Sequence, residues 1–490
     1  MFLKRKKNIS NLMNTINEML DVIPTLSDPY VGFADCLHAL EAIHYHLSIE
    51  EKQPIKTIQK LDVVYDKINH ISNDAVTEKK IEEIKIHMNK LIVDFMDEVI
   101  VKINVLFLPY KASMWDSLDT IYKTVEKDPN CVATVVPIPF YQLSGDNAIF
   151  AYEGNLFPEN ISITNYNEYE LEKEEPDIIF VHNIYDDNNA LTQVHEKYFT
   201  VNLKKYTDML VFVPYHISSF ILPREDNKYL AYNTPGIKNV DKVIMVNNHV
   251  KDSAVRNGIP EEKIQVLGSP KIDAIVNALD SEEDYLEEWK DCINGKTVYL
   301  INTGCMFFAS RPFVNFERLI NFFNIPRFVE NSVVIWRPHP LTLNSIINYT
   351  PSFSQYYNNL VEEIKNKGSL YKGVILDESI DYIPALMAAD VLISEDGSLL
   401  RSFLVTEKKV LYIGENMPEG SLLEPDTFYY AFNEEEPWFK IVKKFSRGID
   451  PLAENRRHMS SQVYVNVDGS SGEKIFKEIK KSLLVEYSEI

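Results

Sequence analysis

Several features that define specialised protein classes are absent from this sequence of 490 residues. No run of about 18 apolar residues occurs, so no membrane-spanning helix is expected. No unit of about 20 to 50 residues repeats, which argues against a solenoid or a propeller. No C-x-x-C pair occurs, and the scattered cysteines indicate reduced, mostly buried thiols in a cytosolic protein rather than a disulfide framework. The cysteines are Cys36, Cys131, Cys292 and Cys305.

Positive charge is also scarce, since 50 Lys and Arg residues face 72 Asp and Glu residues, for a net charge of −22. Proteins that bind nucleic acid present a basic surface, so this balance argues against a nucleic-acid partner. A phosphorylated substrate in a local pocket remains compatible with it. The start, "MFLKRKKNIS", carries four basic residues without a following apolar run, and therefore does not read as a signal peptide. We favour a solvated basic N-terminus over the alternative, a peripheral contact with anionic lipid.

What is present is the composition of a globular protein, with 45% apolar and 25% charged residues. A chain of this length is too long for one core, so two or three domains are expected. Residues 1–100 have apolar side chains at steps of three and four, as in Ile81, Ile84, Met88 and Leu91, which is typical of amphipathic helices. We predict a helical module here that packs on the rest of the chain or on a partner.

From residue 101 the pattern changes to apolar runs of strand length that alternate with helical segments. Runs that are apolar throughout indicate parallel strands covered on both faces. We therefore predict an α/β fold with two Rossmann-like, doubly wound domains at 101–285 and 286–455, and a C-terminal helical segment at 456–490. The runs of the first domain are "INVLFLP", "CVATVVPIP", "PDIIFVHN", "DMLVFVPYH" and "VDKVIMVNN"; those of the second are "KTVYLINTG", "SVVIWRPHP", "GVILDE", "ADVLISEDGS" and "KKVLYIG".

Chemistry-bearing residues follow two strands of the second domain, which we expect to be neighbours. "VVIWRPHPLT" places Arg337 and His339 where prolines should end a strand. "VLISEDGSLLR" places Ser394, Gly397 and Ser398 at a turn into a helix, with Arg401 one turn further on. In such sheets ligands bind beyond the carboxyl ends of the strands, and the start of a helix attracts phosphate.

The two segments together predict a positively polarised seat for a diphosphate. Gly397 would permit close backbone approach, and Ser398 would cap the helix. The acidic residues Glu395 and Asp396 argue against an anion there, unless they face a ribose or a metal. Taken singly, each segment has a simpler explanation, namely an ordinary helix cap and a histidine bonded at a strand end.

The combination resembles the CDP-glycerol glycerophosphotransferases of teichoic acid and capsule synthesis. The resemblance covers about residues 200–480 and is most specific over 333–413, where "EDGS" stands in place of the family's frequent "DYSS". It implies two Rossmann-like halves of the GT-B type, and transfer of glycerol phosphate from CDP-glycerol to an acceptor hydroxyl, releasing CMP. The matching stretches are "VLGSPKID" (266–273), "KTVYLINTG" (296–304), "WRPHP" (336–340) and "DYIPALMAADVLISEDGSLLRSF" (381–403).

Residue by residue, the resemblance implies that His339 contacts the donor pyrophosphate, with Arg337 near it and Ser398 at a second phosphate contact. The family's other histidine lies in a W-H-G-T-P-like motif after a strand of the first half, and here "PYHI" offers His216. His182, at the end of "DIIFVHN", is the alternative base, and each histidine could instead be a polar cap on a buried strand. A base near the working pH would take the proton of the acceptor hydroxyl.

No cofactor or metal is required by this scheme, because the CDP-linked donor is a substrate and fixed cations can stabilise the transferred phosphoryl group. The acidic run "YDDNN" (185–189) is taken as solvated surface rather than a metal site. The acceptor is expected to be a saccharide or polyol phosphate, lipid-linked in one variant of the hypothesis, at the inner face of the membrane. Basic residues that could guide it are Lys204, Lys205, Lys238 and Lys242.

Two other functions remain open at this point. One is a sugar-nucleotide glycosyltransferase or 2-epimerase of the same architecture, which would also use a histidine and a serine turn around a pyrophosphate. The other is a scaffold in a polymer-synthesis assembly, in which residues 1–100 form the working surface.

Overall fold

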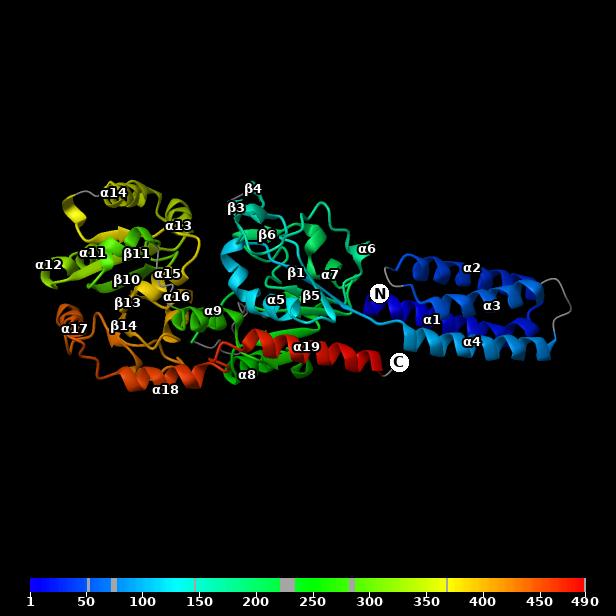
Figure 1. Cartoon of the computed structure of the whole chain (residues 1–490). Coiled ribbons are helices and arrows are strands. Elements are labelled where there is room, and N and C mark those ends of the chain that lie inside the picture. Colours follow the sequence, from blue (N-terminus) through cyan, green and yellow to red (C-terminus); the bar gives the residue numbers. More distant parts are fainter. Residues whose placement is uncertain are drawn as a thin grey trace.

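Three bodies lie in a row in the computed structural model of the chain (Figure 1). The structure describes residues 1–50, 53–71, 77–144, 147–220, 234–281, 287–366 and 369–488. A helical bundle forms one end of the row, a first α/β domain lies in the middle and a second α/β domain forms the other end (Figure 1). Within these ranges, none of the helices has the length and apolar character needed to cross a membrane.

The N-terminal helices form an antiparallel bundle that buries its own apolar faces. One cluster contains the apolar side chains that recur every three or four residues on all four helices, including Met13, Phe33, Val64 and Met88. The predicted helical module is therefore correct; its apolar faces pack mainly on one another, and it contacts the rest of the chain where Leu3 joins an apolar cluster of the first domain. The helices are α1 (Leu3–Val22), α2 (Pro29–Ser48), α3 (Ile55–Ile71) and α4 (Glu78–Glu98).

The basic N-terminus is bound at the junction of the bundle and the first domain. The backbone N–H of Lys4 donates to Asp177 at 2.7 Å, and the ammonium of Lys6 donates to two backbone carbonyls at the end of α4. The ammonium of Lys7 lies 4.5 Å from the centre of the Tyr487 ring. The predicted solvated N-terminus is therefore only partly correct, because these groups contact the protein while the side chains of Arg5 and Lys7 stay about a quarter exposed.

The first α/β domain contains a six-stranded parallel sheet in the order β2-β1-β5-β7-β8-β9. Its strands confirm the five predicted apolar runs and add β9. The strands are β1 (Ile103–Leu108), β2 (Cys131–Val135), β5 (Ile178–Val181), β7 (Met209–Phe212), β8 (Lys242–Met245) and β9 (Ile264–Val266). The helices are α5 (Asp119–Glu126), α6 (Leu171–Glu174), α7 (Thr200–Leu203), α8 (Asn248–Arg256) and α9 (Pro270–Leu279).

A small antiparallel sheet, β4-β3-β6, was not predicted. It consists of β3 (Phe140–Ser144), β4 (Asn147–Ala151) and β6 (Thr192–Val194). The segment around β4 is largely exposed, so its sequence carries no strong apolar signal.

The second α/β domain has a parallel sheet in the order β12-β11-β10-β13-β14-β15. All five predicted runs form strands, but β10 lies between β11 and β13, so the two strands that carry the predicted diphosphate seat are not neighbours. The strands are β10 (Thr297–Thr303), β11 (Ser332–Pro338), β12 (Val374–Leu376), β13 (Val391–Ser394), β14 (Lys409–Tyr412) and β15 (Tyr429–Tyr430).

The helices of the second domain surround this sheet, and the chain ends in two further helices below both domains (Figure 1). They are α10 (Lys290–Ile293), α11 (Pro312–Phe323), α12 (Ile325–Phe328), α13 (Thr342–Tyr349), α14 (Ser354–Lys365), α15 (Ile383–Ala388), α16 (Ser398–Leu404), α17 (Trp438–Phe445), α18 (Ala453–Val463) and α19 (Ser471–Ser488).

Both faces of each parallel sheet are buried, as the apolar runs predict. In β1, Leu106 belongs to one apolar cluster, whereas its neighbours Val105 and Phe107 belong to another on the opposite face. In β10, Leu300 and Tyr299 divide in the same way. The cluster that contains Leu106 also contains Leu300, so one face of each sheet contributes to a single core that joins the two domains.

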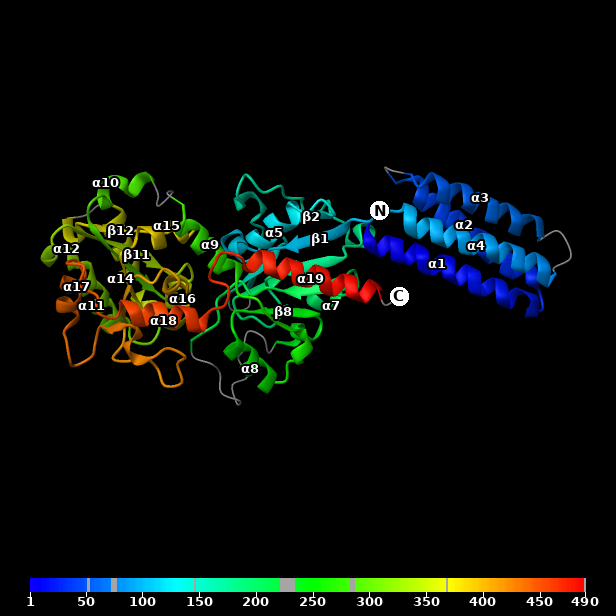
Figure 2. The same cartoon turned by 60° about the horizontal axis from the view of Figure 1, so that its bottom comes forward.

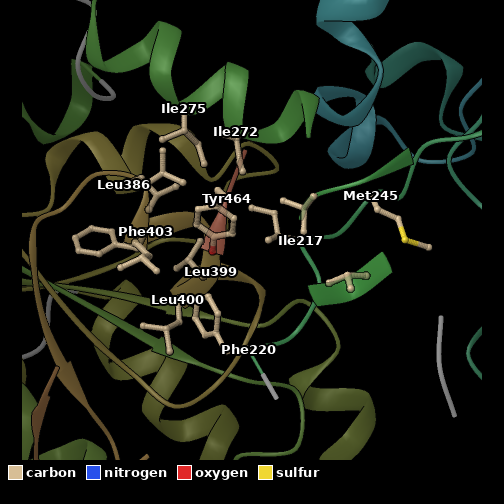
Figure 3. Close-up of a cluster of buried hydrophobic side chains, with 14 of the residues drawn as sticks. Ile217, Phe220, Met245, Ile272, Ile275, Leu386, Leu399, Leu400, Phe403 and Tyr464 are labelled. Carbon is tan, nitrogen blue, oxygen red and sulfur yellow. The ribbon is translucent and has the colours of Figure 1, made fainter. Parts of the chain in front are cut away.

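The centre of this shared core is drawn in Figure 3. Ile217 and Phe220 from the segment after β7 meet the start of α16, and Tyr464 lies beside them. Helices α9 and α15 add Ile272 and Leu386 from above (Figure 3). The labelled side chains that are fully buried or nearly so fix the orientation of the two domains, because separating the domains would expose them to water.

Helix α19 crosses back from the second domain and lies along the first (Figure 2). The Asp273 carboxylate of α9 accepts hydrogen bonds from the N–H groups of Ser471 and Gly472, at 3.0 and 2.7 Å, and from the Thr120 hydroxyl at 2.9 Å. A Cβ at Gly472 would lie 2.6 Å from the Thr120 carbonyl carbon, so glycine permits this close approach of α19 to α5. One carboxylate therefore fixes the start of α19 to two elements of the first domain.

We predict that Asp273→Ala loosens α19, since it leaves two buried N–H donors and the part-buried Thr120 hydroxyl without this acceptor. Hydrogen exchange of the α19 amides should become at least roughly tenfold faster. Asp280→Ala is the matched control, because Asp280 lies at the exposed C-terminal end of α9, the helix that also carries Asp273. Unchanged α19 protection in Asp273→Ala would show that the other contacts of α19, its apolar face and the Lys480–Asp128 pair among them, are enough to hold it in place.

Candidate active site

The carboxyl ends of both parallel sheets carry the candidate residues. In open α/β sheets, ligands bind where the strand order reverses. In the first sheet the order reverses between β1 and β5, and Tyr110, Lys111 and His182 follow these strands. In the second sheet it reverses between β10 and β13, which Gly304 and Glu395 follow.

His182 lies in the core of the first domain and is fully buried. Its Nε2 accepts a hydrogen bond from the backbone N–H of Tyr110 at 3.0 Å, and its Nδ1 lies 3.0 Å from the Ser117 hydroxyl. Burial lowers the pKa of His182 to about 3, so the ring is neutral near pH 7. Because both ring nitrogens are bonded to the protein, the geometry favours its reading as a buried structural histidine over its role as a base.

His216 follows β7, is partly exposed and lines a cavity with Ser218, Gly268 and Ser269. Among the described residues, no group forms a hydrogen bond with its ring. Burial lowers the pKa of His216 to about 4, and the positive charges of Arg401 and Lys271 contribute to the same shift. The imidazole is therefore neutral near pH 7 and able to accept a proton.

His339 follows β11 and is partly buried. Its Nδ1 accepts a hydrogen bond from the backbone N–H of Leu341 at 3.1 Å. In the neutral imidazole the proton must then lie on Nε2, which is left as a donor. Burial lowers the pKa of His339, with further contributions from the positive charges of Lys111 and Arg337.

The guanidinium of Arg337 forms hydrogen bonds with other residues of the chain. Its guanidinium donates to the Asp377 carboxylate at 2.5 Å and to the hydroxyl and carbonyl of Ser379, at 3.0 and 2.9 Å. Arg337 and His339 line a cavity of about 460 Å³, which Tyr357 and Asn358 also border. The charge of Arg337 is neutralised by Asp377, so the residue contributes donors and shape to this cavity rather than a free cation.

The serine turn differs from the prediction in its details. Ser394 is fully buried and its hydroxyl donates to the Glu395 carbonyl at 2.8 Å. The residue that precedes α16 as its cap is Gly397, so the prediction that Ser398 caps the helix was wrong; Ser398 is the exposed first residue of a helix of 7 residues. A Cβ at Gly397 would meet no atom of the described residues closer than 4.0 Å, so packing within them does not require glycine there.

Acidic side chains occupy much of the predicted diphosphate seat. The Glu395 carboxylate accepts the backbone N–H of Gly304 at 2.9 Å, at the point where the second sheet reverses. The Asp396 carboxylate accepts two hydrogen bonds from Arg401, both at 3.1 Å. The predicted positive polarisation of this seat was therefore wrong, because the Gly304 N–H and the Arg401 guanidinium both face carboxylates of the chain.

Polar contacts also join the two domains beside His216. The Asp116 carboxylate of the first domain pairs with the Lys271 ammonium at 2.5 Å and accepts the Tyr382 hydroxyl of the second domain at 2.7 Å. The guanidinium of Arg401 donates to the Ile217 carbonyl at 3.3 Å. Ile217 stands where the resembled family has glycine, and its side chain fills the junction in Figure 3.

The lysines that were predicted to guide the acceptor lie away from the candidate site. Lys204 pairs with Asp241, which precedes β8 and so lies at the amino-terminal edge of the sheet, away from the candidate site. Lys205 donates to the Asn202 side chain, and Lys242 is the first residue of β8. Lys238 ends a short helical turn before the same strand.

The run "YDDNN" is only partly the solvated surface that was predicted. Asp186 is buried and accepts hydrogen bonds from the N–H and the hydroxyl of Thr200, at 2.9 and 2.7 Å. Its role within the described structure is to fix the start of α7.

Sequence reasoning missed Lys111, Asp116, Lys271 and Tyr382. Lys111 could have been found, because it ends the apolar run "INVLFLPYK" just as His182 and His216 end theirs. The other three could not, because their relation depends on how two separate domains meet.

Comparison with known proteins shows similarity in fold. No protein-family model matches the sequence, and no curated protein matches it. A variant of the wall teichoic acid polymerase TagF aligns at a TM-score of 0.52 and 15% identity, over 88% of this chain and 99% of that one. TagF after a 15 minute soak with CDPG aligns at a TM-score of 0.53 and 14% identity, over the same shares.

A UDP-N-acetylglucosamine 2-epimerase aligns at a TM-score of 0.50 and 15% identity, over 80% of this chain and 97% of that one. The predicted arrangement of two Rossmann-like domains of the GT-B type is thereby confirmed. At this level of identity the likeness concerns the fold, and the chemistry must be argued from the residues.

Paired variants of the two first-domain histidines should distinguish a structural from a reactive role. His182→Ala leaves the Tyr110 N–H buried without an acceptor and creates a cavity, costing roughly 2–4 kcal/mol. We expect its melting temperature to fall by roughly 5–12 °C. His216→Ala breaks no hydrogen bond of the described structure and should melt within about 2 °C of the parent. Equal losses would contradict the assignment of His182 to the core.

Proposed function

We propose that this chain transfers glycerol phosphate, or a related polyol phosphate, from a CDP-linked donor to an acceptor hydroxyl and releases CMP. The acceptor is a growing saccharide or polyol-phosphate polymer of the cell wall or capsule. The observation that carries the proposal is the pair His216 and His339, one from each domain. Each is neutral near pH 7, and each has a ring nitrogen with no partner in the described structure.

In the proposed reaction, the neutral ring of His216 accepts the proton of the acceptor hydroxyl as its oxygen attacks the transferred phosphorus. A new oxygen–phosphorus bond forms, and the bond to the CMP oxygen breaks with its electron pair leaving on CMP. The Nε2–H of His339 donates to an oxygen of the diphosphate, which stabilises the charge that spreads over the phosphoryl group. Proton and charge are thus handled by residues of different domains.

The choice of donor rests on the motifs. "WRPHP" and the serine turn resemble CDP-glycerol glycerophosphotransferases, and the fold is similar to that of TagF. The cavity beside Arg337 and His339, with Tyr357 and Asn358 in its wall, offers an aromatic ring and an amide to the rest of the donor. A saccharide acceptor would enter from the first-domain side, where His216 lies.

A second candidate is a non-catalytic scaffold, and two observations favour it. Ile217 fills the domain junction, and Glu395 occupies the Gly304 N–H that a phosphate oxygen would otherwise meet. Under this hypothesis the two domains meet for stability alone, and no nucleotide donor is consumed.

The test is release of CMP from CDP-glycerol in the presence of a polyol-phosphate acceptor. His216→Ala should lower the rate by roughly 10²–10⁴-fold, the usual contribution of a general base. Its affinity for CDP-glycerol, measured by calorimetry, should stay within about twofold, because the ring meets the acceptor rather than the donor. His249→Ala, on the exposed face of α8, is the control.

Turnover of UDP-sugars but not of CDP-glycerol would replace the proposed donor with that of the epimerase-like alternative. Full turnover by His216→Ala would remove this residue as the base. If no nucleotide donor is consumed by the parent protein, the scaffold hypothesis holds.

The pH dependence follows from the burial of His216. Its pKa of about 4 means that the active, neutral form persists as the pH falls from 8 to about 5 and is lost only as the pH passes 4. We expect kcat/KM to show no loss from protonation of this ring between about pH 8 and 5, and no inflection near 6.5. An inflection near 6.5 that disappears in His216→Ala would show that the ring is solvated in the working enzyme.

A further inference from the structure

Among the described residues, Lys111 is a cation without a counterion at the switch point of the first sheet. It follows β1, where the strand order reverses, and it is partly buried. Its ammonium lies 5.2 Å from the centre of the Phe140 ring and 5.8 Å from that of Tyr110. Within the described ranges, no hydrogen bond or ion pair is formed by this ammonium.

Among the described residues, three other cations around the junction are already neutralised. Arg337 pairs with Asp377, Arg401 with Asp396, and Lys271 with Asp116. An ammonium withdrawn from water without a partner costs free energy, and a bound anion would offset that cost.

The nearest carboxylate in electrostatic terms is that of Glu153, which raises the pKa of Lys111 against the larger, lowering effect of burial. This carboxylate accepts the backbone N–H of Ala112 at 2.9 Å, and it forms no ion pair with Lys111 in the described structure. Its effect on the ammonium is therefore partial.

His339 follows β11 of the second domain, and the positive charge of Lys111 from the first domain contributes to lowering the pKa of its imidazole. Since its Nδ1 accepts from Leu341, its free Nε2 carries a proton and is a donor. The two domains thus present a pair of donors at this place, a lysine from one and a histidine from the other. Two such donors suit an anionic oxygen between them.

We infer that Lys111 and His339 form the anion-binding pair of the cleft, with Lys111 holding a phosphate oxygen of the donor from the first-domain side. The inference rests on the proposed function and deepens it, because it moves the phosphate contact from the serine turn to the junction of the domains. It also explains why the turn can contain Glu395 and Asp396. A bound phosphate relieves the desolvation of the Lys111 ammonium, which the lowered pKa of this lysine reflects.

The experiment measures binding of CDP, UDP, cytidine and inorganic pyrophosphate by titration calorimetry to the full chain and three variants. Lys111→Met keeps the apolar stem that lies over the rings and removes the charge. We expect it to weaken CDP and pyrophosphate by roughly 10–100-fold and to leave cytidine within about twofold, since cytidine lacks phosphate. Lys111→Arg should restore most of the affinity, and Lys123→Met, on an exposed lysine of α5, should change nothing.

Three outcomes that contradict part or all of the proposals can be told apart. If CDP and pyrophosphate bind Lys111→Met as tightly as the parent, the inference about Lys111 is overturned while the proposed reaction stands. If the parent binds pyrophosphate and UDP but not CDP, and Lys111→Met weakens both, Lys111 is supported and the CDP-linked donor is rejected. If the parent binds neither pyrophosphate nor either nucleotide, both the anion-binding pair and the transferase proposal are wrong. Melting curves of each variant establish that the fold is intact.

Discussion

The burial of one apolar face from each sheet in a common core is the constraint on which the rest of the structure depends. Leu106 of the first sheet and Leu300 of the second belong to the same cluster, and Ile217 and Phe220 lie at its centre. Because these side chains are removed from water only when the domains meet, the domains have a fixed orientation. That orientation brings together the carboxyl ends of both sheets, where the candidate histidines lie.

Charge around this core is largely neutralised within the protein. The chain has a net charge of −22, yet several cations lie around the junction of its two α/β domains. Most of these cations are paired with a carboxylate of the chain itself. Pairs such as Lys271–Asp116 satisfy the buried groups, but they leave little positive potential for a ligand. Lys111 departs from this arrangement, since its ammonium is partly withdrawn from water and has no ion-pair partner among the described residues.

The three candidate histidines show how the environment assigns one residue type to different roles. His182 has both ring nitrogens bonded within the core, His339 has one bonded and one free, and His216 has neither bonded in the described structure. All three have lowered pKa values, so protonation alone does not separate them. The hydrogen bonds do, because a reactive imidazole needs a nitrogen that is not already committed.

The sequence by itself determined the elements: the helical start, the ten apolar runs that became strands, and the position of His216, Arg337 and His339 at strand ends. These follow from local periodicity, which a strand or a helix expresses wherever it lies. The tertiary structure decided what the residues do. The insertion of β10 between β11 and β13, the contact of Glu395 with Gly304, and the effect of the Lys111 charge on His339 all depend on strand order and domain orientation. Long-range packing sets these, and no local pattern records it.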